Sequence, residues 1–426
     1  MSIEIKNGRL LDPAKDLDKK ANLYIDKGRI VAIGKKPAGF NASKTIDASG
    51  QVVIPGLVDL CVRTREPGFE YKATMDTELR AASKSGITSL CSPPDSDPVV
   101  DSPAVVRLIQ QRASEVGHAR VYTLGAITKG LKGEQLAEMG ALQNAGCIAV
   151  SNALQPIRNS EVLRRAFEYA HSCGLTVFIQ PNDSDLQNNG VANEGAISTR
   201  LGLPPVPETA ETVALARALL LIEQTGVRAH FCRISSARSV SMIRQAQQEG
   251  WPVTADVDIC HLHLTDMDIA NYNVDCHLQP PLKTERDRSA LVRGIEDGVI
   301  TAICSDHQPH DRDAKSAPFS LTEAGASTVE LLLPLVLHLV EGKQLSLPQA
   351  IAAVTSRPAT ILGLEAGTLA KGVPADLCIV DLDNPWQVER ERLLSMGKNT
   401  PFHGWNLSAC VSTTIMNGKV TYKRKA

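Results

Sequence analysis

Eight short apolar runs, separated by longer amphipathic segments, constrain the fold of this chain more than any other feature of its sequence. The runs lie between residue 55 and about residue 350, and they are rich in β-branched side chains. Several of the segments between them are helix-like and close with a glycine, as helices commonly do. Strands that alternate with helices predict a parallel sheet, and eight such units predict a (β/α)8 TIM barrel. The runs are GLVDLCV, ITSLCS, ARVYTLG, GCIAVSN, LTVFIQP, VRAHFCRIS, PVTADVD and ITAICSD.

The two ends of the chain follow a different pattern. Residues 1–54 and 365–426 carry Asn-Gly, Lys-Gly and Ser-Gly pairs between alternating strands, which is typical of hairpins. We therefore expect both ends to form one small β-domain, a β-sandwich, beside a barrel built from residues 55–364.

Composition and charge narrow the class of protein. The 426 residues are 43% hydrophobic, so the chain can bury a large core, and the net charge of -2 offers no basic stripe for nucleic acid. The first residues lack the apolar region of a signal peptide, and the most apolar stretch, VELLLPLVLHLVEG, is short and interrupted by Pro334. The 10 cysteines include no C-x-x-C pair, which favours reduced thiols. We expect a cytoplasmic protein that binds neither nucleic acid nor membrane.

The carboxyl ends of the strands are where such a barrel carries its chemistry. The first strand ends with Cys61 and Arg63 on one face, and the eighth ends with Asp306 followed by His307. A hydrolytic zinc site needs several His, Cys or carboxylate ligands around one point. Asp306 qualifies, Cys61 is a second candidate, and Arg63 is excluded because arginine stays protonated. The other strand ends offer Ser151, Asn152, Ala153, Gln180 and Arg233.

The motifs at these strand ends resemble the bacterial dihydroorotases of the amidohydrolase superfamily. DLCVRTREPG stands where that family has DLHVHLREPG, and SDHQPH stands where it has TDHAPH. The stretches DPVVD at 97–101 and QPPLK at 279–283, with ADLCIVD near the C-terminus, extend the resemblance over the whole chain.

The resemblance also implies that most of the metal site is missing. The family's strand-one histidines, its strand-four carboxylates and its histidines on strands five and six have all been replaced. Asp306, which would orient or deprotonate the attacking water, is retained. The replaced positions are Cys61, Arg63, Asn152, Ala153, Gln180 and Arg233. We therefore expect no metal cofactor.

The substrate pocket that the resemblance implies is altered as well. Arg65 keeps the position that would pair with a substrate carboxylate, but Asp95 and Gln279 stand where the family has asparagines. A carboxylate at 95 would repel an anionic ligand. The loop around Glu323 also departs from the family pattern, so we expect substrate binding to fail along with catalysis.

The remaining polar residues have simpler interpretations. His261 and His263 form an H-x-H pair beyond the seventh strand, where a metal role is less plausible than a structural one. His307 and His310 match family positions and are expected to be hydrogen-bonded structural residues. Because parallel strand ends converge, we predict that a guanidinium of Arg63 or Arg233 lies within ~4 Å of the Asp306 carboxylate.

Two interpretations of function follow. The first is a catalytically inactive dihydroorotase-like protein that serves as a structural subunit for the catalytic chain of aspartate transcarbamoylase in pyrimidine synthesis, within a homo-oligomer or hetero-oligomer. Its partner is inferred from the resemblance to non-catalytic homologues that bind that enzyme. The alternative is an active amidohydrolase, acting on a cyclic amide through an atypical or reduced metal site, which the intact REPG motif and Asp306 support.

Overall fold

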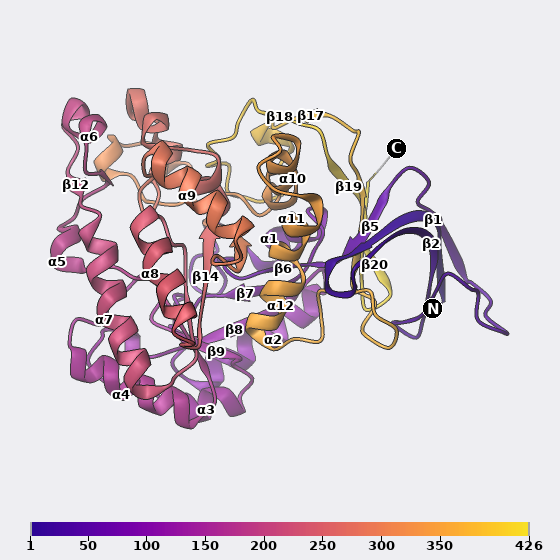
Figure 1. The fold of residues 1–426 in the computed structure, drawn as a ribbon, viewed down its shortest axis with the longest axis horizontal. Coiled ribbons are helices and arrows are strands. Elements are labelled where there is room, and N and C mark those ends of the chain that lie inside the picture. Colours follow the sequence, from indigo (N-terminus) through magenta and orange to yellow (C-terminus); the bar gives the residue numbers. More distant parts are fainter. Residues whose placement is uncertain (1, 425–426) are drawn as a thin grey trace.

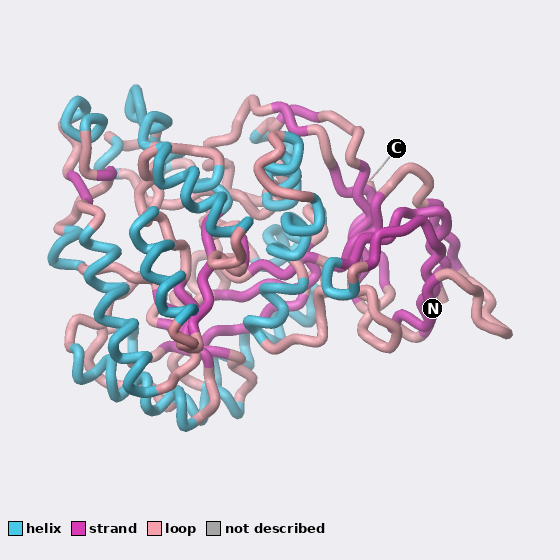
Figure 2. The backbone as a smooth tube through the Cα atoms, in the orientation of Figure 1, coloured by secondary structure: helices cyan, strands magenta, loops and turns pink. Residues whose placement is uncertain are grey.

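A parallel barrel wrapped in helices and an adjoining unit rich in strands make up the protein (Figure 1). The computed structural model describes residues 2–424. The helices lie outside the barrel strands, and the strand-rich unit lies at one side of the barrel, where Figure 2 shows few helices. Among the described residues, no helix combines the length and the apolar character needed to cross a membrane.

Each of the eight predicted runs contains one strand of the barrel. Neighbouring strands pair in parallel, in the order β15-β14-β13-β10-β9-β8-β7-β6. Almost all of their residues are buried, as expected for a parallel sheet with side chains packed on both faces. The strands are β6 (Leu57–Asp59), β7 (Ile87–Ser92), β8 (Arg120–Ala126), β9 (Ala149–Ser151), β10 (Thr176–Ile179), β13 (Ala229–Phe231), β14 (Val253–Asp258) and β15 (Ala302–Cys304).

The barrel closes between the segments that follow its first and eighth strands. The backbone N–H of Arg63 donates to the carbonyl of His307 at 3.0 Å, and the N–H of His307 donates to the carbonyl of Cys61 at 3.1 Å. Val62 and His307 form the corresponding parallel bridge. The residues that end β6 and β15 are therefore held side by side at the carboxyl end of the barrel.

Helices follow the strands and cover the barrel, and the sequence signals at their ends are present. Thr74 caps the first helix through the backbone N–H of Thr77, and Asn159 caps the fourth through the N–H of Glu161. The helices are α1 (Met75–Lys84), α2 (Pro103–Val116), α3 (Met139–Asn144), α4 (Ser160–Ser172), α5 (Ser184–Gln187), α6 (Ala196–Leu201), α7 (Thr209–Thr225), α8 (Ala237–Gln248), α9 (Glu285–Glu296), α10 (Leu332–Glu341), α11 (Leu347–Val354) and α12 (Ser356–Leu362). The short strands β11 (Ala192–Asn193) and β12 (Pro205–Val206) lie between α5 and α7.

The strand-rich unit combines both ends of the chain in one mixed sheet of eight strands. Its apolar core is separate from that of the barrel and includes Ile3, Ile25, Val53, Leu377 and Ile415. The fold is thus a (β/α)8 barrel with a small β-sandwich domain. The strands of this domain are β1 (Ile3–Asp12), β2 (Leu17–Asp26), β3 (Arg29–Ile33), β4 (Lys44–Asp47), β5 (Val52–Pro55), β16 (Leu377–Asp381), β19 (Cys410–Met416) and β20 (Lys419–Lys423).

Two of the predicted hairpin turns are correct. Lys27 and Gly28 connect β2 to β3, and Asn417 and Gly418 connect β19 to β20. All four residues have positive φ, which matches the backbone of the two-residue turns that suit twisted hairpins.

The other three turn predictions are wrong. Lys371 and Gly372 lie between α12 and β16, so they do not connect two strands. Asn7 and Gly8 lie inside the single strand β1, where Asn7 adopts a φ of 63° and the register against β2 shifts. The pair therefore makes a bulge, and a Cβ on Gly8 would lie 2.7 Å from Val53 Cγ2. The Ser49-Gly50 pair separates β4 from β5, which both pair in parallel with β1 and so cannot form a hairpin with each other.

Between β16 and β19 the chain leaves this sheet and packs against the barrel. The short strands β17 (Trp386–Gln387) and β18 (Asn406–Leu407) lie close to α10 in Figure 1, and β18 contacts that helix. Asn399 donates from Nδ2 to the carbonyls of Gln308 and Gly325, both at 3.0 Å. The C-terminal segment thus fixes the loop that follows β15.

Candidate functional site

Two buried arginines share one carboxylate oxygen at the carboxyl end of the barrel. Asp306 Oδ1 accepts from Arg63 Nη1 at 3.2 Å and from Arg233 Nη1 at 3.0 Å. Cys61 Sγ lies 3.1 Å from the same oxygen and 3.0 Å from Arg233 Nη1. The prediction that a guanidinium lies next to Asp306 is confirmed, and both arginines meet it. We call Cys61, Arg63, Arg233 and Asp306 the arginine cluster.

Side chains around the arginine cluster hold it in place. Arg63 Nε donates to Asp95 Oδ2 at 2.8 Å, and Arg233 Nε donates to Gln180 Oε1 at 2.6 Å. Gln308 Nε2 donates to the second oxygen of Asp306 at 2.9 Å. Neither Arg63 nor Arg233 is more than 4% exposed, so these bonds replace most of the water that free guanidiniums would bind.

The local backbone turns these side chains toward the centre of the barrel. Arg233 and Asp306 follow β13 and β15, and their φ angles of 51° and 43° lie in the left-handed region. That region is unfavourable for residues with a Cβ, and such residues often mark functional sites. The family resemblance implies a metal-ligating histidine at position 233 and an aspartate that acts on the attacking water at position 306, and in this chain the side chains at both strained positions make ion pairs.

The negative charge of Asp306 is compensated by positively charged side chains of the protein. Burial opposes ionisation of Asp306, but the guanidiniums of Arg233 and Arg63 outweigh it, so the pKa of this carboxyl is lowered. Burial, followed by the charge of Asp306, raises the pKa of the Cys61 thiol well above its ordinary value. Cys61 is therefore a protonated thiol, whereas zinc binds the thiolate.

The arginine cluster does not fit the zinc ion that the family implies. It offers one carboxylate and one protonated thiol, together with two permanent cations on the oxygen that a metal would need. Gln180 supplies an amide that is already bonded to Arg233. In this arrangement the charges of Arg63, Arg233 and Asp306 are compensated by ion pairs.

The two residues after β9, Asn152 and Ala153, contact the wall of the barrel. Asn152 Oδ1 accepts from the hydroxyl of Thr128 at 2.8 Å, and its Nδ2 donates to the carbonyls of Leu131 and Gln155. Ala153 packs in a small apolar group with Leu131. Residues 152 and 153 thus take no part in the arginine cluster.

His307 is buried and hydrogen-bonded, and the hydrogen bonding was predicted. Its Nε2 is 2.6 Å from Glu78 Oε2, and its Nδ1 accepts from the backbone N–H of Thr328 at 3.1 Å. These bonds link the end of β15 to α1 and to the loop before α10. The ring is completely buried, which leaves it no access to a ligand.

Arg65 and Gln279 lie outside the arginine cluster. Arg65 Nε donates to the carbonyl of Pro309 at 3.0 Å, and its Nη2 is 3.4 Å from His310 Nε2. Gln279 is partly buried and lines a small cavity together with Gln180. The structure thus brings four of the eleven candidate residues into the cluster and two more, Asp95 and Gln180, into direct contact with it.

Asp95 forms an ion pair that the sequence did not predict. We expected its negative charge to repel an anion, and the structure places its Oδ2 atom 2.8 Å from Arg63 Nε. Asp95 follows β7, the neighbour of β6, so the two side chains can reach each other across adjacent strand ends. Its charge is therefore compensated within the protein.

The H-x-H pair does not form a metal site. His261 Nδ1 lies 3.1 Å from Asp258 Oδ2, whereas His263 Nε2 lies 3.0 Å from the carbonyl of Leu335. Burial lowers the pKa of His263 to about 3, so the ring stays neutral. The two rings engage different parts of the structure, as expected for structural histidines.

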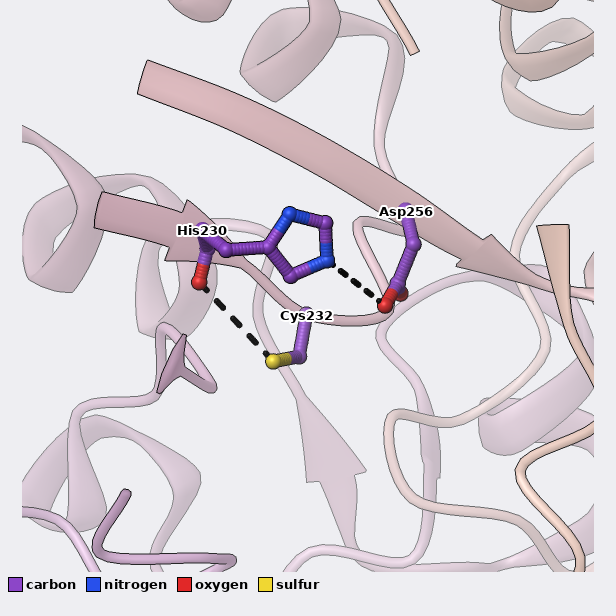
Figure 3. A group of neighbouring side chains, drawn as sticks. All are labelled: His230, Cys232 and Asp256. Atoms are coloured by element: carbon purple, nitrogen blue, oxygen red, sulfur yellow. Dashed lines mark hydrogen bonds and ion pairs between the residues drawn. The ribbon is translucent and has the colours of Figure 1, made fainter. Parts of the chain in front are cut away.

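Sequence reasoning missed a polar group beneath the arginine cluster. His230, Cys232 and Asp256 place their ligand-type atoms within 4.8 Å of one another (Figure 3). His230 Nε2 and Asp256 Oδ2 are 2.9 Å apart, and the second oxygen of Asp256 accepts from the backbone N–H of Arg233 at 2.5 Å. Because both groups already bond to protein partners, this set supports the turn at Arg233. The sequence signal that could have indicated this group is the alternation of polar and apolar residues in the runs that form β13 and β14.

Comparison with known proteins agrees with this fold. A family model described as dihydro-orotase-like matches residues 50–239, and one described as amidohydrolase family matches residues 321–422. The L-hydantoinase (dihydropyrimidinase) from Arthrobacter aurescens has a TM-score of 0.89 and 24% identity, covering 99% of this chain and 96% of its own. The barrel with its composite β-domain is thus the fold of an amidohydrolase.

Curated relatives define the family more narrowly. A dihydroorotase-like protein from Pseudomonas aeruginosa is 49% identical over 99% of this chain and 100% of its own length. A protein of the same description from Pseudomonas putida is 50% identical, covering 99% of each. A dihydroorotase from Syntrophotalea carbinolica is 41% identical, also covering 99% of each. The chain belongs to the dihydroorotase-like family.

Proposed function

We propose that this chain is a catalytically inactive member of the dihydroorotase-like family that serves as a structural subunit. The observation that supports inactivity is the position of two guanidiniums on Asp306 Oδ1, at 3.2 and 3.0 Å. In the family pattern this aspartate acts on a metal-bound water. A bound metal lowers the pKa of water from ~15.7 to ~7, and the arginine cluster offers no ligand set that could do this.

The partner proposed is the catalytic chain of aspartate transcarbamoylase. Support comes from the resemblance to non-catalytic homologues that bind that enzyme, and from a scaffold that is intact although its chemistry has been replaced. All eight barrel strands and the composite β-domain are present. A folded protein with a disabled site can still stabilise the state of a partner that binds it.

The alternative proposal is an active hydrolase of cyclic amides. It is favoured by relatives named dihydroorotase at 39–41% identity over nearly the whole chain. Arg65 and Asp306 would have to bind and activate the substrate without the metal ligands of the family pattern.

Metal content and turnover distinguish the two proposals. The purified chain should hold far less than one zinc ion per molecule by elemental analysis, and it should not hydrolyse dihydroorotate above background. The Syntrophotalea carbinolica relative, purified in the same way, is the matched positive control. Turnover in this chain, with or without stoichiometric zinc, would establish the alternative.

A further inference from the structure

Two hairpins from opposite ends of the chain touch each other at their turns in the β-domain. Gly28 belongs to the turn between β2 and β3, and Gly418 belongs to the turn between β19 and β20. A Cβ on Gly28 would lie 2.9 Å from the carbonyl oxygen of Asn417, and a Cβ on Gly418 would lie 2.9 Å from the Cα of Gly28. The two backbones are therefore in direct contact, which glycine permits because it has no side chain.

The segment that leads into β16 joins the two turns. Ala375 donates its backbone N–H to the carbonyl of Gly28 at 2.8 Å, and the carbonyl of Ala375 accepts from the N–H of Gly418 at 3.0 Å. Arg29 Nη1 donates to the carbonyl of Gly372 at 2.5 Å, which fixes the position of this guanidinium. Three segments that are far apart in the sequence are thus held together by hydrogen bonds at one place.

A hollow of about 310 Å³ lies where these segments meet, and all of its charged side chains are cations. They are Lys27, Arg29 and Lys419, and Pro374 and the turn residues complete the wall. No Asp or Glu lines the hollow. Within residues 2–424, none of the three cations forms an ion pair with an acidic side chain. The hollow therefore holds three positive charges without a compensating carboxylate.

The carboxylate that contacts the second turn already has its own cation. Asp376 Oδ1 accepts from the backbone N–H of Asn417 at 2.8 Å, and Asp376 forms an ion pair with Arg120. Arg120 Nη2 also donates to Asn417 Oδ1 at 2.6 Å. These side chains hold the turn and leave the charges of the hollow uncompensated. Because the whole chain has a net charge of -2, this local excess of cations does not follow from a basic composition.

We propose that this hollow binds a small molecule that carries a diphosphate group. Arginine and lysine are the side chains that bind phosphate oxygens, arginine through its planar fork and lysine as a point charge. Three cations around one hollow match a group with several negative charges better than they match a single carboxylate. All of the lining residues belong to the β-domain, so the site is separate from the arginine cluster and does not depend on the proposed partner.

Calorimetric titration of the full chain tests the site. Inorganic pyrophosphate, ADP and orthophosphate are titrated separately, without divalent cations, which would compete for the phosphate oxygens. We expect pyrophosphate to saturate one site per chain with a dissociation constant on the order of 1 mM, because the three cations are exposed to water, and orthophosphate to bind more weakly. The tighter of pyrophosphate and ADP shows whether the site favours a free diphosphate or one joined to a nucleoside.

A pair of lysine substitutions should remove most of the affinity. Lys27→Gln combined with Lys419→Gln leaves Arg29 as the remaining cation and should weaken pyrophosphate binding about tenfold or more. The matched control is Lys19→Gln combined with Lys20→Gln, which removes the same charge from exposed positions of β2. At about 3.3 Å per residue these lysines lie roughly 20 Å or more from Lys27 along the strand, beyond the Debye length of ~8 Å. The control should bind like the original chain.

Three results would overturn the proposal. They are the absence of saturable pyrophosphate binding, equal affinity in the Lys27 and Lys419 double variant and the original chain, and an equal loss of affinity in the control. The last result would show attraction by overall charge alone. Circular dichroism checks that both double variants fold. If the first does not, the single change Lys419→Gln should still weaken binding about threefold, and an unchanged affinity in it would contradict the site.

Discussion

Arg233 donates from Nη1 to Asp306 Oδ1 over 3.0 Å, so a guanidinium lies on the one carboxylate that the dihydroorotase pattern retains. Asp306 is 7% exposed and Arg233 is 4% exposed. A buried carboxylate needs a compensating charge, and in this chain the charge comes from arginine side chains. In this chain, Asp306 is therefore held in ion pairs with two side chains of the barrel.

Removing the carboxylate should destabilise the fold. Asp306→Ala leaves Arg63 and Arg233 buried without their shared acceptor, and breaking a buried pair in this way costs about 3–5 kcal/mol. Urea denaturation followed by circular dichroism measures the change. The control is Asp297→Ala, which breaks the exposed pair with Arg244 and should cost no more than about 1 kcal/mol. Equal costs for the two variants would contradict the structural role of Asp306.

The dependence of this cost on pH has a definite sign. The folded pKa of Asp306 is lowered, so its contribution to stability is present above the ordinary pKa of an aspartate and is lost as the pH falls through the folded value. The stability difference between the original chain and Asp306→Ala should therefore shrink below about pH 4.

Much of this arrangement follows from the sequence because parallel strands end at one rim. The β-branched runs predicted every barrel strand, and the residues at their ends predicted that Arg63 or Arg233 would meet Asp306. The sequence could not show which partner a long side chain selects. Asp95 reaches Arg63 across adjacent strand ends, and Asn152 turns into the barrel wall, because each choice depends on distances in three dimensions.

A short sequence pattern is ambiguous where two kinds of backbone structure use the same residue types. An Asn-Gly pair suits both a hairpin turn and a bulge, since both need positive φ. At Asn417 and Gly418 the pair makes a turn, whereas at Asn7 and Gly8 it makes a bulge inside β1. In the second case the bulge forms because β1 is hydrogen-bonded to β2 on both sides of it. The two residues Asn-Gly alone do not indicate that the strand continues.

Asp59 should make the protein less stable as the pH rises from about 4 to about 7. Its Oδ1 accepts from the backbone N–H groups of Cys61 and Ser305, but burial raises its pKa to about 7. Between the ordinary and the folded pKa, the folded state keeps a proton that the unfolded state has lost. The resulting loss of stability is about 4 kcal/mol at most.

The variant Asp59→Asn isolates this effect, because asparagine keeps the accepting oxygen and cannot ionise. The free energy of unfolding, measured by urea at pH 5 and pH 8, should fall less in the variant than in the original chain. Asp297→Asn, at an exposed carboxylate, should follow the original chain. Parallel pH profiles for Asp59→Asn and the original chain would show that Asp59 does not titrate in this range.

Restoring the family's metal ligands should recover metal binding with little activity. The five changes are Cys61→His, Arg63→His, Ala153→Asp, Gln180→His and Arg233→His. Zinc affinity depends on these direct ligands, whereas turnover also needs the substrate contacts that Asp95, Gln279 and the loop around Glu323 would still lack. Zinc should raise the melting temperature of this variant and leave that of the original chain unchanged. Turnover near an ordinary ~10 per second would contradict the expectation.

The last prediction concerns assembly with the catalytic chain of aspartate transcarbamoylase. Co-expression of the two chains should give one species of high mass in size-exclusion chromatography, and the transcarbamoylase alone should be less active or less stable. The expected assembly is symmetric, because a partner that binds an oligomer repeats its contact at each equivalent subunit. Cys61→Ser keeps the barrel surface and changes only a buried side chain, so this variant should still assemble.

The L-hydantoinase from Arthrobacter aurescens is a matched control for this assembly, since it shares the fold at a TM-score of 0.89 but only 24% of the sequence. If surface residues particular to this chain carry the contact, the hydantoinase should elute apart from the transcarbamoylase. Separate elution of this chain and the transcarbamoylase at micromolar concentration, with full activity of the transcarbamoylase alone, would contradict the structural-subunit proposal. Binding by both barrels would show that the contact depends on the fold and not on this chain's own surface.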